Sequence, residues 1–453
     1  MSAPDRPPPA LTRWLERASP LAFSSYAIAA AFTTYFCMYA FRKPFGAGSF
    51  EGALLLPWGV PLTYKTLFII SQVLGYCLSK FTGIKVISEM SPARRAVAIL
   101  VVIALAEAAL LLFAIIPAPY NAIAMFLNGL PLGMVWGLVF GFLEGRRVSE
   151  ALGAGLSASY IVASGWVKAF GKWLLALGVD EYWMPVVTGL AFAPLLVFAV
   201  WLLSRLPPPS AEDERVRVKR EPMDARARRG FVRSFFPGLF FLTLLYFFLT
   251  AYRDFRDNFA VELWSALGHD GATILGTAET WIAFGVMIAL GALFMIKDNR
   301  LGLLAVHLVM LAGTALIGLS TLLWQADLLP ALVGGSASAT WMILVGLGLY
   351  LGYVPYGCVL FDRMIAALGV VATAGFMIYV TDAFGYLGSV AVMLYRDLGA
   401  PDLSWLEFFV GFSYLTSVLC SICFVLSMLY FARRSRPAPV EPDAQVKLVS
   451  KAA

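Results

Sequence analysis

The sequence predicts an all-α membrane protein in which twelve transmembrane helices form two pseudo-symmetric six-helix bundles. The 453-residue chain is 60% hydrophobic and 14% charged, with a mean hydropathy of +0.79, whereas soluble domains are about 45–50% apolar. It contains twelve long apolar stretches, each near the roughly 20 residues that span a bilayer as a helix. These stretches are continuously apolar and do not alternate, so a transmembrane β-barrel is excluded.

The twelve stretches divide evenly around a central polar segment. Residues 205–233 are rich in proline and charge and lie near the midpoint of the chain, which is typical of a linker. The first six stretches cover residues 21–45, 64–86, 96–116, 120–143, 151–176 and 183–206. The last six cover residues 235–260, 272–295, 301–323, 336–361, 370–394 and 406–431. The predicted divisions are an N-terminal segment (1–20), a first bundle (21–206), a linker (207–234), a second bundle (235–431) and a tail (432–453).

An internal repeat supports the division into halves. Gly129 and Gly133 in the fourth stretch correspond to Gly348 and Gly352 in the tenth, an offset of 219 residues. Small residues at this spacing also let any membrane helices approach closely. Duplication and membrane packing both remain open as explanations.

The distribution of lysine and arginine predicts the orientation. The polar segment before the first apolar stretch is too long and too rich in proline for a typical cleavable signal peptide. We therefore expect the first stretch to be retained as a membrane helix. Because basic residues favour the cytoplasmic side, both termini are predicted to be cytoplasmic, in a bacterial inner membrane. The cations on that side are Arg94, Arg95, Arg146, Arg147, Lys297, Arg300, Arg433, Arg434 and Arg436. This bias accounts for the net charge of +6 without a nucleic-acid partner.

Catalytic, metal and cofactor sites are not predicted. All five cysteines lie in apolar stretches, and the Cys420–Cys423 pair lacks the further ligands of a metal site. Nucleotide-binding loops and hydrolase motifs are absent from the sequence, so we do not expect an enzyme. The expected partners are a small-molecule substrate and membrane lipids, and the expected state is a monomer.

Two arginines are the strongest candidates for a site. Arg42 and Arg253 each lie deep in an apolar stretch, one in each half, 211 residues apart. A charge at such a position is costly and usually functional, and the planar guanidinium donates in parallel to two oxygens of a phosphate or carboxylate. The alternative for Arg42, which adjoins Lys43, is that both side chains reach the headgroups as interfacial anchors.

Arg253 also belongs to a charge run, Arg253-Asp254-Phe255-Arg256-Asp257. On a helix Asp257 is four residues from Arg253, so carboxylates can neutralise the cations internally. A salt bridge acting as a gate or a proton-linked switch is therefore an alternative to anion binding.

Three short segments carry a family resemblance. Residues 39–45 read YAFRKPF, residues 79–81 read SKF, and residues 384–391 read FGYLGSVA. Together with twelve spans and a basic central loop, they resemble the organophosphate:phosphate antiporters of the major facilitator superfamily, which include the glycerol-3-phosphate transporters. The whole chain is also similar to a separate bacterial branch of that superfamily. The resemblance covers short parts of both halves.

The resemblance implies two bundles that rock about a site at the middle of the membrane. It also implies that Arg42 and Arg253 hold the anion, with Lys80 as an auxiliary cation. Tyr39 and Tyr252 adjoin the two arginines and are candidates to contribute hydroxyl groups. The antiporter motif lacks the charge run around Arg253, and this departure keeps the gating alternative open.

Intramembrane carboxylates favour a second interpretation. Glu107, Glu279 and Asp382 each lie in an apolar stretch and can carry a proton. The competing account is structural pairing with Lys168 or with the arginines. The candidates for proton coupling or gating are Asp382, Glu279, Asp254, Asp257, Arg256 and Lys168.

Three functions follow from these patterns. The first is a secondary transporter that moves a small organic anion, such as a phosphorylated metabolite, by alternating access. The second is a proton-coupled transporter of an uncharged or zwitterionic solute. The third is a transport-inactive sensor or assembly partner that retains the fold.

Overall fold

The computed structural model of the chain describes residues 9–57, 59–88, 90, 92–144, 146, 149–210, 213, 225–332, 335–369 and 374–435. Arg147, Arg436, most of the predicted linker and the predicted tail after residue 435 lie outside the described residues.

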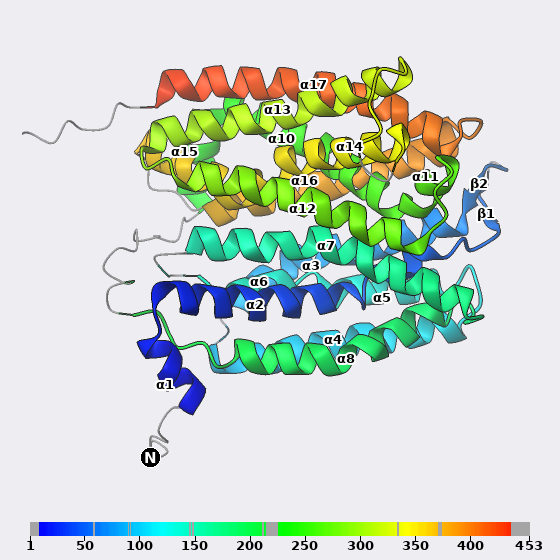
Figure 1. Cartoon of the computed structure of the whole chain (residues 1–453), viewed down its shortest axis with the longest axis horizontal. Coiled ribbons are helices and arrows are strands. Elements are labelled where there is room, and N and C mark those ends of the chain that lie inside the picture. The colour runs from blue at the N-terminus through cyan, green and yellow to red at the C-terminus, as the bar shows by residue number, and fades with distance from the viewer. Residues whose placement is uncertain are drawn as a thin grey trace, which may run out of the picture.

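The helices form two halves that lie against each other (Figure 1). The first half contains α2 (Pro20–Tyr39), the 3-10 helix η1 (Pro44–Ala47), α3 (Tyr64–Ser88), α4 (Pro92–Ile115), α5 (Ala122–Leu132), α6 (Val135–Phe140), α7 (Ser149–Ala176) and α8 (Met184–Leu203). The second contains α10 (Ala225–Asn258), α11 (Ala260–Ala266), α12 (Ala272–Phe294), α13 (Asn299–Gln325), α14 (Ala337–Pro355), the π-helix η2 (Tyr356–Leu360), α15 (Phe361–Leu368), α16 (Ala374–Leu394), the π-helix η3 (Tyr395–Gly399) and α17 (Trp405–Arg434). The halves meet mainly where α7 packs on α12 and α3 packs on α16.

The apolar outer surface is that of a multi-pass membrane protein. Within the described chain, nine helical segments are long and apolar enough to cross a bilayer. The helices α3, α7 and α16 are not among these nine, and they carry the interior charges Lys80, Lys168 and Asp382. Large side chains that would contact lipid are exposed on the outer helices, including Leu105, Phe198, Phe284, Leu319 and Val418. Exposed apolar faces of this extent suit a hydrocarbon environment.

Several predicted limits were wrong for identifiable reasons. The first membrane helix ends at Tyr39, not at residue 45, because Pro44 cannot donate the next backbone hydrogen bond. The fourth stretch is divided into α5 and α6, with Pro131 near the break. α10 begins at Ala225, ten residues before the predicted stretch and within the predicted linker.

Two further elements mark opposite ends of the molecule. The strands β1 (Ala53–Leu55) and β2 (Pro61–Thr63) form an antiparallel hairpin in which Leu54 pairs with Leu62. We call this end the hairpin end. α1 (Ala10–Arg17) and the end of α17 lie at the opposite end, which we call the terminal end (Figure 1).

Gly165 of α7 permits a close approach between the halves near the hairpin end. A Cβ atom there would lie 2.0 Å from the carbonyl oxygen of Leu275 in α12, and a backbone atom cannot rotate away. We expect Gly165→Ala to lower the stability of the folded protein by about 1–3 kcal/mol through overpacking, measured by thermal denaturation in detergent. Gly153→Ala in the same helix is the control, because its Cβ would approach only a ring atom of Phe140 at 3.4 Å. An equal change in melting temperature for both variants would contradict the expectation.

Candidate functional site

A buried cluster of charged and phenolic side chains lies where the two halves meet. It surrounds a small pocket with a cavity volume of about 10 Å³. The pocket is lined by Tyr39, Arg42, Lys43, Tyr160, Ser164, Arg253, Asp254, Asp257 and Tyr350. Both arginines singled out in the sequence therefore face one pocket, one from each half.

Arg42 occupies the turn that follows α2 and is only 5% exposed. Its guanidinium carbon lies 4.0 Å from the centre of the Tyr76 ring, close enough for a cation–π contact. Among the described residues it has no carboxylate within 4.0 Å, and its Nε donates no hydrogen bond. The interpretation of Arg42 and Lys43 as interfacial anchors is wrong, because both side chains are buried between the halves.

Arg253 is neutralised by its immediate neighbour. Its Nε and Nη2 donate to Asp254 Oδ1 at 3.0 and 2.7 Å, and Nη1 donates to the hydroxyl of Tyr353. Asp254 also accepts a hydrogen bond from Ser389 Oγ at 2.7 Å. The predicted pairing of Arg253 with Asp257, four residues later, does not form.

Asp257 instead holds cations of the opposite half. Lys43 Nζ lies 2.5 Å from Asp257 Oδ2 and Lys168 Nζ lies 2.7 Å from Oδ1. Ser164 also donates to this carboxylate, and Lys43 donates to Asn258 Oδ1 at 2.8 Å. One carboxylate from α10 is therefore shared by two lysines across the contact between the halves.

The predicted substrate-binding residue Lys80 and the predicted coupling residues Arg256, Glu279 and Asp382 lie outside the pocket. Arg256 pairs with Glu279 of α12 at 2.7 Å, entirely within the second half. Lys80 of α3 approaches Asp382 of α16 at 3.6 Å and joins the halves nearer the terminal end. Of the three carboxylates suggested to pair with Lys168 or with the arginines, Glu279 pairs with an arginine and Asp382 with Lys80. Both buried oxygens of Glu107 lack a hydrogen-bond partner in the described chain.

Two tyrosine hydroxyl groups connect Asp382 with Arg253 in the pocket. Tyr246 donates its single O–H to Asp382 at 2.8 Å. Its oxygen lies 2.9 Å from the Tyr353 hydroxyl, which accepts from Arg253 and can donate to Tyr246. The environment of Asp382 is therefore linked by direct contacts to the pocket arginine.

The hairpin end carries further contacts between the halves. Lys65 of α3 pairs with Glu262 of α11. Thr63 Oγ1 donates to Asp397 Oδ2 at 2.9 Å. Together with Asp257, these contacts close the hairpin side of the pocket.

A metal site is not apparent. Within the part of the chain that the structure describes, no group of three or more His, Cys, Asp or Glu side chains is arranged to hold a metal ion.

Comparison with known proteins establishes the family and the fold. A family model described as a family of unknown function, DUF5690, matches residues 44–434. The chain belongs to the DUF5690 family. No curated protein matches the sequence.

Solved structures similar to this DUF5690 member are transporters. A D-xylose–proton symporter matches with a TM-score of 0.59 and 12% identity, over 92% of this chain and 98% of that chain. A POT family transporter in complex with 5-aminolevulinic acid matches with a TM-score of 0.57 and 13% identity, over 90% of this chain and 96% of that chain. The inward-open xylose transporter XylE from E. coli matches with a TM-score of 0.55 and 10% identity, over 88% and 95%. At these identities the matches establish the major facilitator fold, as predicted, and do not identify a substrate.

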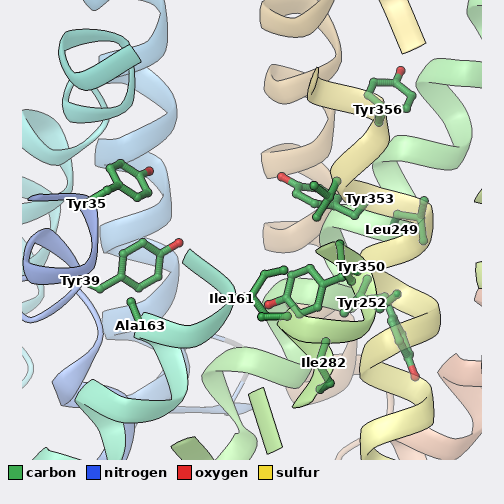
Figure 2. Packing of buried hydrophobic residues seen from close by; sticks show 14 of the residues in the cluster. Tyr35, Tyr39, Ile161, Ala163, Leu249, Tyr252, Ile282, Tyr350, Tyr353 and Tyr356 are labelled. Carbon is green, nitrogen blue, oxygen red and sulfur yellow. The ribbon is translucent and has the colours of Figure 1, made fainter. Parts of the chain in front are cut away.

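Two tyrosines chosen by sequence adjacency have different surroundings in this DUF5690 member. Figure 2 shows the Tyr39 hydroxyl directed into the space between the halves, whereas Tyr252 points away from it. The Tyr252 hydroxyl is hydrogen-bonded to Ser413 Oγ at 2.7 Å, and its ring stacks on Phe409. Adjacent residues on a helix project about 100° apart, so the place of Tyr252 beside Arg253 did not make it a pocket residue.

Sequence reasoning gave little weight to other residues around the pocket. Tyr350 and Tyr353 of the second half face Tyr35 and Tyr39 of the first (Figure 2). Buried amides behind Arg42, those of Gln72 and Asn128, were not singled out. The available signal was a polar side chain inside an apolar stretch, the same signal that identified the arginines.

Proposed function

We propose that the protein is a secondary transporter that moves a small organic anion, such as a phosphorylated metabolite, by alternating access. The observation that carries this proposal is an excess of buried positive charge between the halves. Asp257 is shared by Lys43 and Lys168, and Arg42 has no carboxylate among the described residues. Arg253 in the pocket pairs with Asp254, and outside the pocket Lys80 pairs with Asp382 and Arg256 pairs with Glu279.

Arg42 and one of the two lysines that share Asp257 are thus left without a carboxylate of their own. Buried charges without compensation are costly, and a bound dianion would balance this excess. Arg42 supplies a planar donor and the lysines supply flexible ones. The likeness of residues 39–45 to the organophosphate:phosphate antiporters supports the same substrate class and an exchange mechanism.

The contacts of Asp257 suggest how binding would release the halves. In the closed arrangement this carboxylate occupies the lysines that an anionic substrate would contact. A substrate anion that takes its place at Lys43 and Lys168 removes the bond to α10. Opening at the hairpin end then depends on the remaining contacts of Lys65 and Thr63.

The charge distribution supports an orientation. Arg95, Arg300 and Arg434 lie in loops or helix ends at the terminal end, whereas Asp180 and Glu181 lie near the hairpin. Basic residues favour the cytoplasmic side. We therefore place both termini in the cytoplasm of a bacterial cell and the hairpin outside its inner membrane.

Transport assays in proteoliposomes test this function. The purified full-length chain is reconstituted with or without internal phosphate, and uptake of labelled organic phosphates, dicarboxylates, neutral sugars and peptides is measured. We expect uptake of at least one dianion to exceed uptake of every neutral solute and to require an internal anion. Uptake of neutral solutes alone would overturn the proposal.

A second candidate function, proton-coupled transport, rests on the place of Asp382. This carboxylate pairs with Lys80 across the halves and accepts from Tyr246, so its protonation would weaken a contact between the halves. The D-xylose–proton symporter that shares the fold is consistent with this alternative.

The Asp382→Asn variant separates the two functions. If protons drive transport, we expect uptake under an imposed pH gradient to fall at least about tenfold, equivalent to about 1.4 kcal/mol, while exchange without a gradient persists. Asp397→Asn is the control, because Asp397 also bridges the halves but lies at the hairpin end. If uptake by the wild-type protein does not change with an imposed pH gradient, proton-coupled transport is excluded.

A further inference from the structure

The first membrane helix ends at the pocket. α2 ends at Tyr39, and Pro44 starts a short 3-10 helix without a backbone N–H. Gly46 N donates to Lys43 O, not to the carbonyl of Arg42 as in a continuous α-helix. The carbonyl groups of Phe41 and Arg42 are therefore outside the helical hydrogen-bond pattern. In a membrane interior such groups need partners.

Two buried amide side chains provide those partners. Asn128 Nδ2 donates to the carbonyl oxygens of Phe41 and Ala106, both at 3.0 Å. Gln72 Nε2 donates to the carbonyl oxygen of Arg42 at 3.0 Å and to Asn128 Oδ1 at 2.8 Å. Both N–H groups of each amide are thus used, and the amides are linked to each other.

Close packing of α3 and α5 brings the two amides together. A Cβ atom at Gly129 would lie 2.2 Å from the carbonyl oxygen of Gln72, and one at Gly75 would lie 2.1 Å from that of Phe126. Only glycine permits this approach at either position. Gly129 therefore lets α5 approach α3 closely enough for the neighbouring Asn128 side chain to reach Gln72.

The same face of α3 also contacts the Arg42 side chain. Tyr76 lies four residues after Gln72 and is on the same helix face. Its ring packs against the Arg42 guanidinium at 4.0 Å. Gln72 thus holds the backbone of Arg42, while Tyr76 contacts its charged group.

We propose that Gln72 and Asn128 are positioning residues that hold the interrupted end of the first helix, and through it aim Arg42 into the pocket. The inference deepens the proposed function, since Arg42 is the anion-binding group there. Neither amide lines the pocket, so both act through Arg42. The chemical requirement is two N–H donors at each position, which no carboxylate or alkyl side chain of similar size supplies.

Chemical modification of Arg42 tests the positioning without any substrate. The full-length protein in detergent is treated with phenylglyoxal, and modification of Arg42 is followed by peptide mass spectrometry. We expect Asn128→Ala and Gln72→Met to increase its rate at least about threefold, because a loosened segment opens more often. Asn121→Ala is the control. It removes a buried amide of the same half that donates to Phe113 O at 3.3 Å, away from Arg42.

Binding of inorganic phosphate, measured by calorimetry, tests the consequence for the site. We expect Asn128→Ala to weaken binding about tenfold in the wild-type background, and less than about twofold in the Arg42→Lys background, because coupled residues are not additive. The inference is overturned if Asn128→Ala and Asn121→Ala change Arg42 modification equally, or if neither changes it. If the proteoliposomes take up neutral solutes alone but modification responds as expected, the proposed function fails and the positioning role stands.

Discussion

Replacement of Arg42 by lysine is expected to reduce anion uptake by about 100-fold or more, although the positive charge is retained. Lysine cannot donate two parallel hydrogen bonds to one phosphate or carboxylate group. It also lacks the planar group that stacks on Tyr76 at 4.0 Å. The measurement is the initial rate of uptake of the best anion in proteoliposomes.

Arg95→Lys is the matched control for this prediction. Arg95 belongs to the same half and donates to the carbonyl oxygen of Gly141, but it does not line the pocket. We expect its uptake rate to remain within about twofold of wild type, as is usual for substitutions remote from a site. Wild-type uptake of every anion by the Arg42→Lys protein would show that Arg42 is not a ligand.

Asp257→Asn is expected to make the unliganded protein less stable and more responsive to anions. The substitution leaves Lys43 and Lys168 buried without their carboxylate, and breaking a buried ion pair costs about 3–5 kcal/mol. An added anion that binds the lysines restores the balance, so the rise in melting temperature with phosphate is larger than in wild type. Thermal denaturation with and without phosphate measures both effects.

Glu279→Gln distinguishes this outcome from a general loss of stability. Glu279 forms a buried pair with Arg256 inside the second half, and neither residue lines the pocket. Its loss should lower the melting temperature without increasing the response to phosphate. If the two variants respond alike, Asp257 does not occupy the place of the substrate anion.

Hydrophobic composition and the spacing of apolar stretches were sufficient to predict the fold class, which the structure and its relatives confirm. A membrane helix satisfies its own backbone hydrogen bonds, so each span is decided by about 20 local residues. The same reasoning identified Arg42 and Arg253, since a buried charge in an apolar stretch is conspicuous without any knowledge of its neighbours. That they bind substrate remains a prediction.

The ion-pair partner of each charged residue could not be predicted from local spacing in the sequence. The charge run allowed its own carboxylates to neutralise Arg253, and Asp254 does so, whereas Asp257, at the spacing of four residues, faces the lysines of the other half. The helix face of each residue depends on how α10 is rotated against its main neighbours, α16 and α17. That rotation is decided by packing between segments about 90 residues or more apart in the chain.

The sequence by itself determined the membrane class, the twelve segments and the presence of two arginines within apolar stretches, because these depend on local hydrophobicity and helix length. Only the tertiary structure decided that both arginines line one pocket, that Tyr252 lies outside it and that Gln72 and Asn128 hold the interrupted helix. Those facts depend on contacts between segments distant in the chain. Such contacts follow from the relative rotation and close approach of whole helices.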